Sequence, residues 1–155
     1  MSLEAEISAA ALTLVPGAAS GETLCLDEPL SFWGGLDSAS GLIIDRWHPQ
    51  HGQSMSGKVL LMASGRGSSS GSAVLAEAIR LGTGPVAIVL LKRDPIVIVG
   101  AAIAAELYSI SCPVILAGDS DWKQLRGAAR LEVEADQRLA KIRVAKSKNR
   151  DIGNA

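Results

Sequence analysis

The chain has 155 residues, of which 48% are hydrophobic and only 3% are aromatic, and its formal net charge at pH 7 is -1. This length fits one domain, whose core has to be built from Ala, Val, Ile and Leu. The near-neutral charge lacks the basic excess of a non-specific nucleic-acid binder. Two cysteines cannot make a disulfide framework or a four-ligand zinc site.

The N-terminal residues and the apolar runs indicate neither targeting nor a membrane span. The first ten residues contain Glu4 and Glu6 and no basic residue, which is unlike a secretory or transit peptide. The longest apolar run, residues 96–105, is far shorter than the about 20 residues that a membrane-spanning helix needs. We therefore expect a cytoplasmic protein in which Cys25 and Cys112 are buried, inert thiols.

The first third of the chain is predicted to be rich in strands and loops. Residues 1–10 are expected to be flexible. Apolar runs at 11–15 and 23–26 predict a pair of strands joined by a turn at 17–21. Residues 31–57 are rich in Gly, Ser, Asp and His and contain a strand only at 42–44. Long irregular segments in compact domains tend to carry function, so this segment is the first candidate region.

The rest of the chain alternates strands and helices. The unbroken apolar run at 86–91 predicts a parallel strand that is covered on both faces. Pro95 is expected to open a helix. The predicted elements are strands at 58–62, 86–91, 114–116 and 131–135, and helices at 68–81, 96–108 and 121–125, with a helical or loose tail after 136. This order predicts an α/β domain with a parallel β core and additional antiparallel strands.

The clearest local motif is SGRGSSSGS at residues 64–72, between a predicted strand and a predicted helix. Glycines let the backbone approach a ligand closely. Free N–H groups at a helix start favour an anion, and Arg66 can hold a carboxylate or phosphate with two hydrogen bonds. The motif therefore predicts an anion-binding loop.

Two other interpretations of the loop stay open. In the first, Ser68 or Ser69 only caps the following helix, although capping needs only one serine. The glycines also form GxGxxxG, a loosened dinucleotide fingerprint, and Asp94 follows the next strand. The loop is not a phosphate-binding Walker motif, because no Gly-Lys-Ser/Thr follows.

Asp45, His48 and His51 form a second polar cluster. A carboxylate and two imidazoles can bind a metal, but Pro49 opposes a helix that would present all three on one face. We therefore expect no metal site in this chain. An acid–base or hydrogen-bonding role beside a substrate is the preferred interpretation.

Several motifs in one order resemble the small subunit of aconitase X. They are LSFWGGLD (30–37), IDRWHP (44–49), GKVL (57–60) and SGRGSSS (64–70), followed by LAE (75–77), GPVA (84–87) and AELY (105–108). The resemblance covers roughly residues 11–125.

The resemblance implies a swivelling domain of β/β/α architecture, here residues 11–136, with a flexible N-terminus before it and a basic tail at 137–155. The domain would sit over the active site of a larger subunit that holds an iron or iron–sulfur centre, while this chain binds no cofactor itself. The enzyme would be a hydro-lyase that dehydrates a small hydroxy-carboxylate. Bacterial members dehydrate cis-3-hydroxy-L-proline and archaeal members 5-phosphomevalonate, and the motif versions here are similar to the bacterial type.

The resemblance also implies site residues. Aconitases proper carry Gly-Ser-Ser-Arg, in which the first serine is the catalytic base and the arginine binds a carboxylate. Here Ser68 takes the place of the base, and Ser70 stands where the arginine would be, which argues against tricarboxylates. The expected substrate-binding residues are Arg66, Gly67, Ser69, Ser70, Asp45 and His48.

A lone serine is a very poor base, and each unit of pKa correction costs about 1.36 kcal/mol. A helix N-terminus contributes about 0.3–1 kcal/mol, or up to about 2. The isolated chain is therefore expected to be inactive without its large subunit. Two alternatives remain: a stand-alone anion- or nucleotide-binding module, and a structural partner that docks another protein through Trp33 and Trp47.

Overall fold

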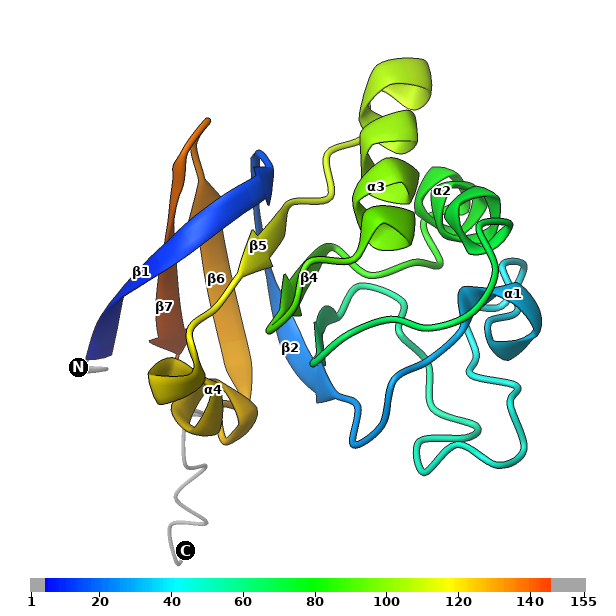
Figure 1. Cartoon of the computed structure of the whole chain (residues 1–155), viewed down its shortest axis with the longest axis horizontal. Helices are drawn as coiled ribbons and strands as arrows, with labels where there is room; N and C mark the ends of the chain where they lie inside the picture. The colour runs from blue at the N-terminus through cyan, green and yellow to red at the C-terminus, as the bar shows by residue number, and fades with distance from the viewer. Residues whose placement is uncertain (1–4, 146–155) are drawn as a thin grey trace, which may run out of the picture.

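The structure is a computed structural model that describes residues 5–145, with side chains from 11 to 144. Within these residues, seven strands close into a barrel in the order β1-β5-β4-β3-β2-β6-β7 (Figure 1). The strands are β1 (Ala5–Val15), β2 (Gly17–Cys25), β3 (Val59–Met62), β4 (Ala87–Leu90), β5 (Val114–Leu116), β6 (Arg130–Ala135) and β7 (Leu139–Ala145). The helices are α1 (Phe32–Gly35), α2 (Gly71–Leu81), α3 (Pro95–Tyr108) and α4 (Asp119–Arg126).

The barrel has a parallel and an antiparallel part. β2, β3, β4 and β5 run parallel to one another, and β1, β6 and β7 close the barrel by antiparallel pairing, with β1 against β5 and β6 against β2. Every residue of β3 and β4 is buried, which explains their unbroken apolar runs. The predicted fold class, a parallel β core with additional antiparallel strands, is confirmed.

Alternate residues of the parallel strands enter two separate cores. Leu60 of β3 belongs to a cluster with Leu75 of α2, on the side that the helices cover. Leu61 belongs to a second cluster that contains Leu131 of β6 and Leu125 of α4, and this cluster fills the barrel. In Figure 1, α2 and α3 lie side by side over one flank of the barrel, with α1 beside α2.

The prediction that the first two strands pair with each other is wrong. β1 and β2 follow one another directly at Pro16, yet β1 pairs with β5 and β7, and β2 pairs with β3 and β6. The apolar pattern predicts that a segment is a strand, but it does not predict with which strands the segment pairs. In a closed barrel both edges of each strand are taken, here by segments distant in sequence.

At both ends of the described chain, strands occupy residues that were predicted to be flexible, helical or loose. β1 begins at Ala5, so residues 5–10 are a strand rather than a flexible arm. β7 replaces the helical or loose segment expected after residue 136, because alternating Ala140 and Ile142 are buried inside the barrel. Asp136 accepts hydrogen bonds at 2.8 Å from the N–H groups of Arg138 and Leu139 and so fixes the β6–β7 turn. The remainder of the predicted basic tail, 146–155, and residues 1–4 lie outside the described residues.

The remaining predicted elements are present with shifted limits. The helix expected from residue 68 begins at Gly71, and residues 42 and 43 form isolated bridges rather than a strand. α3 begins at Pro95, as predicted, and the Asp94 side chain caps it. Of the helices in the described part of the chain, none has the length and apolar character to cross a membrane.

Candidate functional site

Three loops meet at the carboxyl ends of the parallel strands. Residues 26–58 follow β2, residues 63–70 follow β3 and residues 91–94 follow β4. The carbonyl oxygen of Ala63 accepts hydrogen bonds from the N–H groups of Leu91 and Lys92, at 3.1 and 2.9 Å, so the second and third loops are joined. Crevices at the carboxyl ends of parallel strands are the usual binding sites of α/β proteins. The predicted anion loop lies in such a place.

Two glycines let the loop 64–70 pack against its neighbours. A Cβ atom on Gly65 would collide with the carboxylate of Asp94. A Cβ atom on Gly67, whose φ is +99°, would collide with Ser31 Oγ and lie 2.8 Å from Ser31 Cβ. The glycines are therefore required by close approach within the protein as well as by backbone conformation.

Asp94 has a structural role in this arrangement. Its side chain is 7% exposed, and Oδ1 accepts hydrogen bonds from the N–H groups of Ile96, at 2.9 Å, and Val97, at 3.4 Å. These bonds make it the N-cap of α3. The dinucleotide interpretation needs Asp94 as the acidic residue that contacts the ribose. Because the Asp94 side chain caps α3, this residue does not support that interpretation.

The three serines of the loop are exposed at the start of α2. Ser68 Oγ accepts a hydrogen bond from the N–H of Ser70 at 3.2 Å, and the Ser68 carbonyl accepts one from Gly71 at 2.9 Å. Ser68 thus holds the turn before α2, whereas the N-cap of α2 is Ser70, whose side chain makes no capping hydrogen bond, so the predicted capping by Ser68 or Ser69 is not observed. The bond from the Ser70 N–H holds the Ser68 hydroxyl oxygen at the positive end of the helix dipole, facing solvent. The turn bond is accepted by the hydroxyl oxygen, and the exposed Ser68 stays accessible for a role as a base.

Arg66, in the loop 64–70, lies beside Asp45 of the irregular segment. Arg66 Nη2 is 3.9 Å from Asp45 Oδ2, and the side chains are 58% and 22% exposed. Asp45 Oδ1 accepts a hydrogen bond from the N–H of Trp47 at 3.0 Å. An ion pair this long and exposed contributes at most about 1 kcal/mol, so the guanidinium is free to bind an incoming carboxylate.

His48 is not part of this cluster. Its side chain is 4% exposed, Nε2 lies 2.9 Å from the carbonyl oxygen of Glu28, and Nδ1 accepts from the N–H of Gln50 at 3.0 Å. Both ring nitrogens are thereby used, with the proton on Nε2. The imidazole connects two parts of the irregular segment, and neither of its nitrogens is left for the predicted contact with a substrate.

The cluster of Asp45, His48 and His51 does not fit a metal ion. His48 has no free nitrogen, and His51 is exposed. Among the residues that the structure describes, no group of three or more His, Cys, Asp or Glu side chains could hold a metal. Burial raises the pKa of the Cys112 thiol to about 12, which keeps it protonated and inert as expected.

Ser31 is a site residue that the sequence analysis missed. Its hydroxyl donates to the carbonyl oxygen of Trp33 at 3.0 Å and lies against Gly67. The only signal was its place before the Phe-Trp-Gly-Gly motif, which does not reveal a contact with a loop more than thirty residues later.

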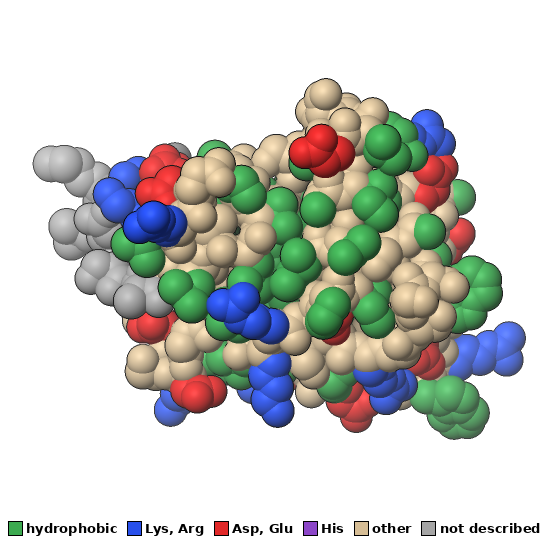
Figure 2. All heavy atoms as spheres, turned by 45° about the horizontal axis from the view of Figure 1, so that its top comes forward, with side chains coloured by type: hydrophobic (Ala, Val, Ile, Leu, Met, Phe, Trp, Pro, Cys, Tyr) green, Lys and Arg blue, Asp and Glu red, His purple; other side chains and the backbone are tan. Residues whose placement is uncertain are grey.

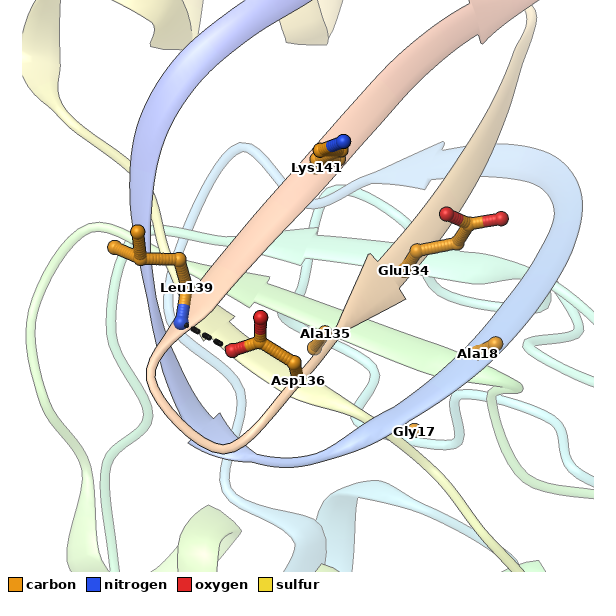
Figure 3. A pocket seen from close by; sticks show the side chains of 7 residues that line it. All are labelled: Gly17, Ala18, Glu134, Ala135, Asp136, Leu139 and Lys141. Atoms are coloured by element: carbon orange, nitrogen blue, oxygen red, sulfur yellow. Dashed lines mark hydrogen bonds between the residues drawn. The ribbon is translucent and has the colours of Figure 1, made fainter.

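A separate hollow lies at the opposite end of the barrel, where β2 begins and β6 ends (Figure 3). Its lining comes from the starts of β2 and β7, the end of β6 and the turn between β6 and β7: Gly17, Ala18, Glu134, Ala135, Asp136, Leu139 and Lys141. The Asp136 carboxylate is occupied by the hydrogen bonds of the β6–β7 turn, and none of the motifs found in the sequence lies in this hollow. The loop after β3 remains the candidate site.

Comparisons with known proteins show the family of the chain. Residues 8–142 match the family model described as the aconitase X swivel domain. The chain is similar to the cis-3-hydroxy-L-proline dehydratase of Pseudomonas aeruginosa, with 43% identity over 131 residues that cover 80% of this chain and 22% of that protein. It is also similar to the phosphomevalonate dehydratase small subunit of Methanothermobacter thermautotrophicus, with 40% identity over 129 residues that cover 82% of this chain and 92% of that one.

Among solved structures, the chain resembles the crystal structure of Thermococcus kodakaraensis aconitase X in its holo-form. The TM-score is 0.72 at 29% identity, and the match covers 88% of this chain and 98% of that chain. The chain thus spans about one fifth of the length of the Pseudomonas protein and nearly all of the Methanothermobacter small subunit. The motifs, the barrel and the family model agree, and the chain belongs to the aconitase X swivel-domain family.

Proposed function

We propose that this chain is the small subunit of a hydro-lyase that dehydrates cis-3-hydroxy-L-proline, and that Ser68 is its general base. The observation that carries the proposal is the exposed Ser68 hydroxyl at the start of α2, with the loosely held Arg66 two residues before it. The 43% identity to a protein named cis-3-hydroxy-L-proline dehydratase supports the choice of substrate.

The chemistry assigns a task to each side chain. Dehydration moves the proton α to the substrate carboxylate onto Ser68 Oγ, and the C–H electron pair becomes the new double bond. The β-hydroxyl leaves with the C–O electron pair and takes up a proton from an acid of the large subunit to form water. Arg66 binds the substrate carboxylate, with Ser69 and Ser70 available for further hydrogen bonds. A Lewis acid, expected as an iron or iron–sulfur centre in the large subunit, would assist the departure of the hydroxyl.

Ser68 needs help to act as a base. The start of α2 stabilises an alkoxide by about 0.3–1 kcal/mol, or up to about 2. Since one pKa unit corresponds to about 1.36 kcal/mol, the helix supplies about one unit of the required shift. Arg66 adds charge nearby, and the rest has to come from the large subunit. We therefore propose that the isolated chain has no dehydratase activity.

The test is a reconstituted complex of this chain with the aconitase X large subunit of the same organism. Replacing Ser68→Ala should lower kcat on cis-3-hydroxy-L-proline about 10²–10⁴-fold, the usual contribution of a general base. Ser69→Ala and Ser70→Ala check the register of the assignment: as substrate-binding residues they should act mainly on KM, and a larger loss of kcat at either serine would place the base there. A Ser68→Ala complex with near-normal kcat would overturn the assignment.

A second candidate is phosphomevalonate dehydration. One observation favours it: the chain matches 92% of the length of a protein named phosphomevalonate dehydratase small subunit. The same complex should be assayed on both substrates. Turnover of 5-phosphomevalonate alone would establish the second candidate, and phosphate binding by the isolated chain without either turnover would favour the anion-binding module.

A further inference from the structure

Exposed tryptophans stand beside the candidate site. Trp47 is 92% exposed and Trp33 is 61% exposed, in a chain whose aromatic content is only 3%. Both come from the irregular segment 31–57, together with exposed Ile44 at 47%. A large aromatic side chain left in water is unusual, because its burial removes about 150–250 Å² from solvent.

Hydrogen bonds and close packing connect both tryptophans to the loop. The backbone nitrogen of Trp33 lies 3.6 Å from the place of a Cβ atom on Gly71, the first residue of α2. The Trp47 N–H donates to Asp45 at 3.0 Å, and the same carboxylate faces Arg66 at 3.9 Å. Trp33 and Trp47 are therefore anchored next to the loop that carries Ser68, and we call the surface that they form with Ile44 the rim of this loop.

The exposed Ser68 needs a second protein to cover it, and that protein has to contact the rim. Ser68 and its neighbours are exposed, and the described residues offer no metal site. A dehydration site has to exclude bulk water and bring a Lewis acid to the substrate. Whatever protein closes over Ser68 must therefore cover the surface that flanks it.

The comparisons indicate the size of that protein. The matched region is 22% of the Pseudomonas dehydratase but 92% of the Methanothermobacter small subunit. The same domain therefore occurs both as a minor part of a long chain and as a separate subunit. The occupant of the rim is the large subunit, which corresponds to the rest of the long chain.

We propose that Trp33 and Trp47 are the anchors through which the large subunit docks over Ser68. This inference rests on the proposed function. With their exposed fractions of 61% and 92%, the two tryptophans would supply about 230–380 Å² of the about 800 Å² per partner of a standard interface. Tryptophan is also enriched among the residues that dominate binding energy.

A competing apolar surface lies on α3. Figure 2 shows hydrophobic side chains gathered over this helix and the neighbouring strands. Val99 and Leu107 there are 47% and 69% exposed. Leu107 is at the far end of α3 from Asp94, about 20 Å along the helix axis at 1.5 Å per residue. Leu107 is therefore a matched control: an exposed apolar side chain remote from the loop.

The experiment titrates the purified large subunit into this chain by calorimetry, without substrate. We expect Trp47→Ala and Trp33→Ala each to raise the Kd at least tenfold, and Leu107→Ala to change it less than twofold. Circular dichroism checks that each variant is folded, which is expected because the replaced rings are exposed. Trp47→Phe should recover part of the lost affinity.

The outcomes separate this inference from the proposed function. Wild-type affinity of both tryptophan variants overturns the docking proposal, and so does an equal loss with Leu107→Ala or the absence of any wild-type complex. Weakened binding of the tryptophan variants in a complex that dehydrates neither substrate supports the docking surface and refutes the proposed reaction. Normal dehydration with unchanged affinities refutes only the docking surface.

Discussion

Gly67 provides a sharp test of how the loop is held. Its φ of +99° strains any residue with a side chain, at about 1–2 kcal/mol. The new Cβ atom in Gly67→Ala would also meet Ser31 Oγ and lie 2.8 Å from Ser31 Cβ, so rotation of the serine hydroxyl alone cannot remove the clash.

The magnitude follows from these contacts. Displacing Ser31 breaks its hydrogen bond to the Trp33 carbonyl, worth about 0.5–1.5 kcal/mol, and moving the loop adds overpacking strain of about 1–3 kcal/mol. Together with the backbone strain, Gly67→Ala should therefore lower the free energy of unfolding by about 2.5–6.5 kcal/mol. In the reconstituted complex, a loop shift of about 1 Å should reduce kcat about 10²-fold.

Gly52 is the matched control for the backbone strain. Its φ is +84°, and a Cβ atom there would have no heavy atom within 4 Å. Gly52→Ala should cost only the strain, about 1–2 kcal/mol, and leave kcat unchanged. Urea unfolding followed by tryptophan fluorescence gives the free energies. Ser31→Gly combined with Gly67→Ala should recover the part of the loss due to the clash. Equal losses for Gly67→Ala and Gly52→Ala, or no recovery in the double variant, would refute the reasoning.

The remaining predictions concern His48 and Cys112. His48→Ala leaves the Gln50 N–H and the Glu28 carbonyl without their partner, so the free energy of unfolding should fall by about 2–4 kcal/mol while kcat of the assembled enzyme stays within twofold. Loss of kcat at unchanged stability would instead restore the substrate-binding role. Burial raises the pKa of Cys112 from 9.0 to about 12, so the unfolded chain ionises first and stability should fall as pH rises from 9 toward 12. Unfolding measured across this range should show a smaller fall in Cys112→Ala, and a parallel fall in both proteins would contradict the burial effect.

Local patterns in the sequence determined most of the individual elements. β3 and β4 were predictable because both faces of each strand are covered, which leaves an unbroken apolar run. α3 was predictable from its proline and its apolar length. The position of the SGRGSSS loop after a buried strand, and the family motifs, were likewise visible in the sequence.

Only the tertiary structure decided which elements and side chains meet. Strand periodicity shows which face is buried but not which strand lies alongside, so the separation of β1 from β2 and the closure by β7 were not predictable. The polar residues followed the same rule. In the sequence, His48 and Asp94 were candidates for contacts with a ligand. In the structure, each makes hydrogen bonds with the backbone that give it a structural role. Conversely, the contact of Ser31 with Gly67 depends on two loops that only the closed barrel brings together. The sequence thus predicted a chemistry for the loop, whereas the packing of distant segments determined which of the neighbouring side chains remain without a structural partner.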